Sequence, residues 1–217
     1  MIRDVKTNKR TRNAKRTRER ILQKAAELFA EKGYEGTAVS AITKGSGVSK
    51  RMLYHYYGDK QGLYRALFIH EWGLLKEWYD KALKERMERG EPASTRELLK
   101  QSVAIFFDFL AKRPQFVRLL MWEGLEGGEI SRSIWKDIRG PLYVQMEFLI
   151  RQAQEEGLLD INLDAGHFVV SFLGAISFYF AYAPTLEEMI HEDPFTETAL
   201  EKRKFQLLRL LEAVFET

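Results

Sequence analysis

The sequence predicts an all-α fold of about nine helices. Apolar residues recur every three to four positions along most of the chain, as they do on one face of an amphipathic helix. Glycine and proline interrupt this pattern at residues 90–92, 127–128 and 157. No segment alternates β-branched and polar residues between hairpin turns, so strands are not expected.

The first periodic segment begins at Ala14 and ends at Gly33. Its apolar stripe consists of Ile21, Leu22, Ala25, Ala26, Leu28 and Phe29. Residues 1–13 are rich in Lys, Arg, Thr and Asn and lack this periodicity, so we expect a flexible basic arm there. We place one domain over residues 14–66 and a second over residues 67–217.

Two short helices are expected after Gly33, over residues 40–46 and 50–56, with a turn at Gly47 between them. Asp59 can cap a longer helix that runs to about Met87. The remaining periodic segments cover residues 95–112, 114–125, 131–156, 165–183 and 198–215. Pro141 predicts a kink or a break inside one of them, and the stretch from Pro184 to Pro194 separates the last two.

Composition excludes several classes of protein. The chain has 217 residues, 45% of them hydrophobic and 30% charged, which is ordinary for a globular protein. It contains no cysteine, so a disulfide, a thiolate metal site and a cysteine nucleophile are excluded. No uninterrupted apolar run reaches the ~18 residues of a membrane span, and the first ten residues lack the apolar core of a secretion signal. We expect a cytoplasmic protein without a membrane partner.

Charge is distributed unevenly along the chain. Residues 1–60 carry 15 Lys and Arg against 6 Asp and Glu, whereas the whole chain has a net charge of only +3. Residues 1–20 alone hold nine basic residues against two acidic ones. Such an arm can lie along phosphates or in a minor groove, or it can be a solvated tail that aids solubility. A basic end joined to an acidic body favours a polyanion-binding module.

The second short helix has two faces with different chemistry. Leu53 and Tyr57 are four residues apart and share a face, which we expect to point inward. Arg51 and His55 lie about 200° around the helix, where they can reach base edges or phosphates. Ser49 precedes the helix as an N-cap candidate, and the free N–H groups behind it can meet a phosphate.

Charged and aromatic residues extend this surface. Lys50 and Lys60 can contribute charge contacts at its two ends, and the hydroxyls of Tyr54 and Tyr56 can reach backbone oxygens of DNA. Each of these residues taken alone is as well explained by packing or by ordinary surface exposure. The turn, the bracing helix and the basic arm together favour a helix-turn-helix that binds duplex DNA.

These residues resemble the tetracycline-repressor (TetR) family of bacterial and archaeal transcriptional regulators. The resemblance rests on AAELFAEKGYEGTAVSAI and on Ile42, Gly47-Val48-Ser49, Leu53-Tyr54, Tyr56-Tyr57, Lys60 and Leu63. It covers about residues 15–67 and implies that DNA-backbone contacts are made by Thr37, Lys50, Tyr54, Tyr56 and Lys60. Ser46 stands where the family usually has Ala, and Arg51 where it usually has a small residue. Arg51 therefore indicates a distinct base preference.

Aromatic residues are abundant in the helical body. They can form the core and a dimer surface, which is the simpler interpretation of each one. The resemblance implies, alternatively, a cavity for a small apolar or aromatic effector whose binding lowers DNA affinity by favouring one conformer. The candidate effector-binding residues are Phe106, Phe109, Trp122, Glu123, Gln145, Phe148, His167, Phe172 and Tyr179.

The last two predicted helices resemble the pair through which family members form homodimers. The segment SFLGAISFYFAYA is apolar on nearly all sides and contains Gly174, Ala175 and Ser177, so a covering partner helix is expected. Two-fold symmetry then predicts a pseudo-palindromic operator. Residues 14–66 are thus expected to form a DNA-binding domain, and residues 67–217 an effector-binding and dimerisation domain. The function expected is a ligand-responsive transcriptional repressor; the alternative is a structural DNA-binding protein without an effector. No catalytic constellation, metal-ligand spacing or cofactor motif is present.

Overall fold

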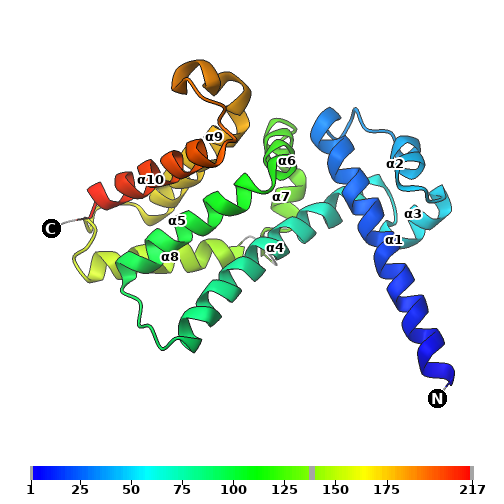
Figure 1. The fold of residues 1–217 in the computed structure, drawn as a ribbon, viewed down its shortest axis with the longest axis horizontal. Coiled ribbons are helices and arrows are strands. Elements are labelled where there is room, and N and C mark those ends of the chain that lie inside the picture. The colour runs from blue at the N-terminus through cyan, green and yellow to red at the C-terminus, as the bar shows by residue number, and fades with distance from the viewer. Residues whose placement is uncertain (1, 137–139, 216–217) are drawn as a thin grey trace. The chain divides into compact units, whose positions relative to one another are not determined.

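The computed structural model describes residues 2–136 and 140–215, and this part of the chain contains ten α-helices and no strand (Figure 1). The predicted all-α fold is confirmed. The additional helix arises because the segment predicted over 131–156 forms two, α7 (Glu129–Ser133) and α8 (Gly140–Glu155). Pro141 is the second residue of α8, where a missing N–H interrupts no helical hydrogen bond.

The chain folds into two compact units. The first contains residues 1–71 and 118–134, and the second contains residues 72–117 and 135–217. Two helices are divided between the units, namely α4 (Lys60–Glu88) and α6 (Pro114–Leu125). The first unit otherwise holds α1 (Ile2–Lys32), α2 (Val39–Ser46), α3 (Lys50–Tyr57) and α7. The second holds α5 (Thr95–Ala111), α8, α9 (Ala165–Ile190) and α10 (Glu197–Ala213).

This division differs from the domain boundary that the sequence predicts between residues 66 and 67, because residues 118–134 pack with the N-terminal helices. The side chains of Arg118 and Trp122 both donate to the carbonyl of Ala30, with Nε at 2.8 Å and Nε1 at 3.3 Å. Glu126 accepts a hydrogen bond from the backbone N–H of Tyr34 at 3.3 Å. These partners are about ninety positions apart in the sequence, so local periodicity does not reveal them.

The helix α1 begins at Ile2, whereas the sequence predicts a flexible arm over residues 1–13 and a helix only from Ala14. Met1 lies outside the described residues. Lys and Arg are good helix formers and extend a helix without an apolar stripe to guide it. The absence of apolar periodicity was therefore a poor guide to the backbone of this segment.

The helix α9 also extends beyond its predicted end, because it continues through Pro184 to Ile190. Proline lacks the N–H that would donate to the carbonyl four residues earlier, a loss that usually ends or kinks a helix. Here Ala183 and Leu186 are both buried on the two sides of Pro184, and packing of this face favours continued helix. The helix ends instead at His191, which adopts a left-handed conformation with φ 58°.

The core of the second unit is built around α5, which packs against α8, α9 and α10 (Figure 1). A cluster of buried apolar side chains joins these helices: Leu99, Ile150, Ala153, Leu159, Ala165, Val169, Leu211 and Phe215. The N-terminus of α5 is secured by a capping box in which Ser94 and Glu97 satisfy each other's backbone N–H groups.

By length and composition, α9 is the one helix in the described ranges that could cross a lipid bilayer. Core helices of water-soluble proteins commonly meet the same criterion, so one such helix is weak evidence for a membrane span. Its exposed residues include Val170, Gly174, Phe178 and Tyr182.

Candidate functional site

The turn between α2 and α3 depends on two residues with special conformations. Gly47 caps α2 with φ 65°, a left-handed conformation that glycine adopts without a steric penalty. Ser49 caps α3, and its hydroxyl accepts a hydrogen bond from the N–H of Met52 at 3.2 Å. The predicted N-cap is confirmed, and it sets the direction in which α3 leaves the turn.

The inward face of α3 is the predicted one. Leu53 is fully buried, and the hydroxyl of Tyr57 donates to the backbone carbonyl of Arg18 in α1 at 3.0 Å. Burial raises the pKa of Tyr57 to about 12, so this phenol stays protonated and remains a donor at neutral pH. Burial of Leu53 and the bond from Tyr57 to α1 therefore hold α3 at two successive turns.

The opposite face of α3 is open. Lys50, Arg51 and His55 are all exposed, as the helix geometry predicts. In the part of the chain that is described, no hydrogen bond or ion pair involves the side chain of Arg51 or His55. A guanidinium and an imidazole are therefore available to a ligand on this face, together with the ammonium of Lys50.

Aromatic rings support the cations around this surface. The ammonium of Lys50 lies 5.6 Å from the centre of the Tyr54 ring, and the guanidinium of Arg18 lies 5.1 Å from that of Tyr56. The ammonium of Lys60 lies 4.3 Å from the centre of the Tyr34 ring. Such cation–π contacts orient long side chains that would otherwise sample many rotamers.

Arg18 is a surface cation that the sequence did not single out. It belongs to the basic segment at the N-terminus, but its position between Ala14 and Leu22 places it in line with the apolar stripe of α1. A cation in line with an apolar stripe was the signal that could have distinguished Arg18 from its basic neighbours. Its contact with Tyr56 brings it next to α3.

Thr37 does not lie where a DNA-contacting side chain is expected. Only 2% of its surface is exposed, and its hydroxyl oxygen lies 2.8 Å from the carbonyl oxygen of Gly33 and 3.1 Å from that of Leu28. The hydroxyl is thus a donor within the first unit, where it fastens the chain to the end of α1. The predicted role of Thr37 in DNA contact is corrected to this structural one.

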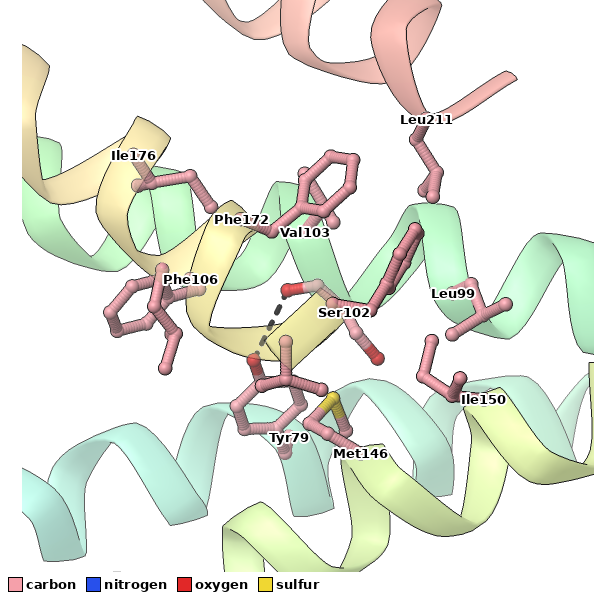
Figure 2. A pocket seen from close by; sticks show the side chains of 13 residues that line it. Tyr79, Leu99, Ser102, Val103, Phe106, Met146, Ile150, Phe172, Ile176 and Leu211 are labelled. Atoms are coloured by element: carbon pink, nitrogen blue, oxygen red, sulfur yellow. Dashed lines mark hydrogen bonds between the residues drawn. The ribbon is translucent and has the colours of Figure 1, made fainter. Parts of the chain in front are cut away.

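The second unit contains a small apolar cavity of about 70 Å³ between α4, α5, α8, α9 and α10. Phe106, Met146 and Phe172 are among the side chains that surround it (Figure 2). Tyr79 also lines the cavity and donates its hydroxyl to the carbonyl of Ser102 at 3.1 Å, as the dashed line in Figure 2 shows. The hydroxyl of Ser102 donates to Leu98 at 2.8 Å, so the polar groups of the wall are already satisfied.

A wider, open groove of about 410 Å³ adjoins this cavity and shares Tyr79, Ser102 and Met146 with it. Of the predicted effector-binding residues, Phe106 and Phe172 line the small cavity, and Gln145 and Phe148 line the groove. These four residues are therefore brought around two adjoining spaces.

The other five candidates are placed elsewhere. Phe109 packs on Trp78 and Phe116, and Tyr179 donates its hydroxyl to Pro194 at 2.8 Å. His167 is exposed in the first turn of α9. Trp122 and Glu123 belong to the first unit. Tyr79 and Met146, which line both spaces, were missed because only aromatic clusters and isolated polar residues were considered within the body.

Two family models match the chain. The one for bacterial regulatory proteins of the tetR family matches residues 21–67, and the one for the tetracyclin repressor-like C-terminal domain matches residues 96–210. The chain belongs to the TetR family. The resemblance inferred from the sequence is thereby confirmed.

Relatives within the TetR family agree with this assignment. The transcriptional repressor NicS of Pseudomonas putida is 25% identical over 190 residues, which is 87% of each chain. The ketosteroid regulator KstR2 of Mycobacterium tuberculosis superimposes with a TM-score of 0.71 at 18% identity and covers 92% of this chain and 95% of that one. FadR of Bacillus subtilis, solved with stearoyl-CoA, gives 0.68 at 20% identity and covers 91% and 99%. The chain is a DNA-binding transcriptional regulator of this family and not an enzyme.

Thr37→Val tests the corrected role. Removing the hydroxyl should lower the free energy of unfolding by about 1 kcal/mol, because buried carbonyls lose a donor. DNA affinity of the folded protein and its dependence on salt should not change. Urea unfolding and binding titrations at several salt concentrations measure both. Thr43→Val, which removes a hydroxyl from the surface of α2, is the control. Weaker DNA binding with unchanged stability would restore the DNA-contact role.

Proposed function

We propose that the chain is a cytoplasmic homodimeric repressor that binds a pseudo-palindromic operator and is released by a small apolar or aromatic effector. The observation that carries the proposal is the open face of α3, where Lys50, Arg51 and His55 are exposed on a helix fixed by a cap and by α1. Arg can donate two hydrogen bonds to guanine in the major groove, and Lys can neutralise phosphate. Lys60, Tyr54 and Tyr56 supply flanking groups for backbone contacts.

The first experiment is a selection of bound duplexes from a random DNA pool by the purified full-length protein at a stated salt concentration. Enrichment of a palindrome with half-sites about one helical turn apart, or a multiple of this distance, is the expected result. Enrichment of no sequence would favour the alternative, a structural DNA-binding protein that needs no effector.

Arg51→Ala should relax base preference at one position in each half-site and cost about 1–3 kcal/mol of binding free energy there. Binding to operators with each base at every position measures this loss. Arg65→Ala, at an exposed position of α4, is the control for removing a cation from the first unit. Unchanged selectivity in Arg51→Ala would remove Arg51 from base readout.

The proposed dimer surface follows a line of exposed residues along α9. Val170, Phe178 and Tyr182 are 54%, 52% and 53% exposed, and Gly174 completes the four-residue spacing. Phe205 and Leu210 of α10 are exposed as well, at 58% and 55%. Contiguous apolar surface of this kind favours a partner, and a second copy of the same two helices supplies a self-complementary one.

Gly174→Glu should convert the dimer to monomers, because the added carboxylate would be buried without a partner at the centre of the interface. A Cβ at this position meets no atom of its own chain within 4 Å, so the monomer should fold normally. Sedimentation velocity measures the oligomeric state. Met87→Glu, at an exposed apolar residue of α4, should leave the dimer intact. A dimeric Gly174→Glu variant with unchanged affinity would place the interface elsewhere.

The two adjoining spaces of the second unit support an apolar effector. Tyr79, Ser102 and Met146 line both the small apolar cavity and the larger groove. Because the hydrogen bonds of Tyr79 and Ser102 are satisfied within the protein, a ligand gains most from apolar burial. The stearoyl-CoA complex of FadR demonstrates for that protein that this fold can hold an acyl ligand.

Val103→Phe should lower sensitivity to the effector about tenfold or more, because the larger side chain fills the cavity. A compound screen for release of the selected operator supplies the effector, and titration of release measures sensitivity. Operator affinity without effector should stay the same. Val214→Phe, the same substitution at an exposed valine outside both spaces, is the matched control. Equal sensitivity of Val103→Phe and the unaltered protein would contradict this cavity as the effector site.

A further inference from the structure

The first unit contains a second hollow, which the proposed function does not use. It has a volume of about 330 Å³ and lies among residues that follow α1, begin α4, end α6 and begin α7. Carboxylates and phenol rings dominate its wall: Glu35, Glu123, Glu126, Glu129, Tyr34 and Tyr64. All of these residues belong to the same compact unit.

The carboxylates of this acidic pocket are held by neutral donors. Glu123 accepts from the N–H of Ser131 at 2.8 Å, and Glu126 accepts from the N–H of Tyr34. The Nε2 of Gln61 lies 3.4 Å from Glu129. Within the described ranges, none of the four Glu residues of the pocket forms an ion pair with Lys or Arg. Their negative charge is therefore concentrated around the hollow.

Tyr64 gives an independent indication of a ligand. Its side chain is 2% exposed, and its hydroxyl has no hydrogen-bond partner in the part of the chain that is described. Buried hydroxyls are rarely left in this state. Burial, together with the nearby charges of Glu123 and Glu126, raises the pKa of Tyr64, so its phenol stays protonated. The oxygen can accept a hydrogen bond from a donor that enters between these carboxylates.

The aromatic wall also suits a cation. The rings of Tyr34 and Tyr64 lie 5.1 Å apart, and the ammonium of Lys60 already lies 4.3 Å from the centre of the Tyr34 ring. Ring faces attract ammonium groups, most strongly where water is partly excluded. A phosphate or carboxylate ligand would instead be repelled by the four Glu residues.

We propose that this acidic pocket binds a small organic cation that carries one or two protonated amines. Ammonium N–H groups would donate to Glu126, Glu129 and the oxygen of Tyr64, and the carbon chain would lie against the tyrosine rings. A metal ion is a poorer match, since no group of three or more His, Cys, Asp or Glu in the described ranges is arranged to hold one. The site is separate from the apolar cavity of the second unit and would give the regulator a second chemical input.

Calorimetric titration of the full-length protein with 1,4-diaminobutane, at fixed ionic strength, tests the proposal. Saturable binding of the diamine and no binding of the neutral analogue 1,4-butanediol are expected. Glu126→Gln and Glu129→Gln should each weaken binding about fivefold or more, because one carboxylate is lost from a partly shielded site. Glu31→Gln, at an exposed carboxylate of α1 outside the pocket, is the matched control and should bind normally.

Tyr64→Phe separates a ligand contact from a purely structural defect. The variant should bind the diamine more weakly while its unfolding midpoint stays the same or rises, because a buried unsatisfied hydroxyl is removed. Unchanged diamine binding in Tyr64→Phe would remove the phenol from the site. Equal binding of the diol, equal loss in Glu31→Gln, or displacement by Mg²⁺ at matched ionic strength would each overturn a specific amine site.

Discussion

The attachment of α3 to α1 is the constraint on which DNA recognition depends. An eight-residue helix is not stable alone, because nucleation costs more than so few hydrogen bonds return. Burial of Leu53, the bond from Tyr57 to the carbonyl of Arg18, and the Ser49 cap together hold α3 in place. A rotation of α3 by half a turn would point Arg51 and His55 inward. The contacts of the inward face therefore determine which side chains of α3 point outward.

The end of α1 is completed by side chains from a distant part of the chain. Carbonyls in the last turn of a helix lack helical partners, and that of Ala30 accepts from both Arg118 and Trp122. The N–H of Tyr34 is directed instead to Glu126. The same helix α6 begins in the second unit and ends against α1 in the first. A change that moves α6 would thus act directly on the helix that braces α3.

An element could be predicted from the sequence where the interactions that define it join residues close together along the chain. The turn at Gly47, the Ser49 cap and the two faces of α3 were predicted correctly because they depend on residues within one or two turns. The surroundings of Thr37, Trp122 and Glu123 could not be predicted, because their partners are remote or their burial depends on tertiary packing. Phe106 and Phe172 were found by composition alone, which cannot distinguish a cavity wall from the packed core around Phe109. Pro184 shows the same limit, since packing outweighed its local preference.

The proposed dimer places a protein partner rather than lipid against the exposed side of α9. One face of α9 is built into the core through Ile176, Tyr179 and Phe180. Arg203 of α10 donates to the carbonyl of Ala175 at 2.9 Å and lies 5.5 Å from the centre of the Tyr179 ring. Its burial lowers the pKa of Arg203, although the guanidinium remains charged at neutral pH. Placing a charged residue along a helix costs free energy in the hydrocarbon of a membrane. The same residue is acceptable where water reaches the two helices. Gly174 lies in the row of exposed residues on α9. Because glycine has no side chain, another helix can approach closely at this position.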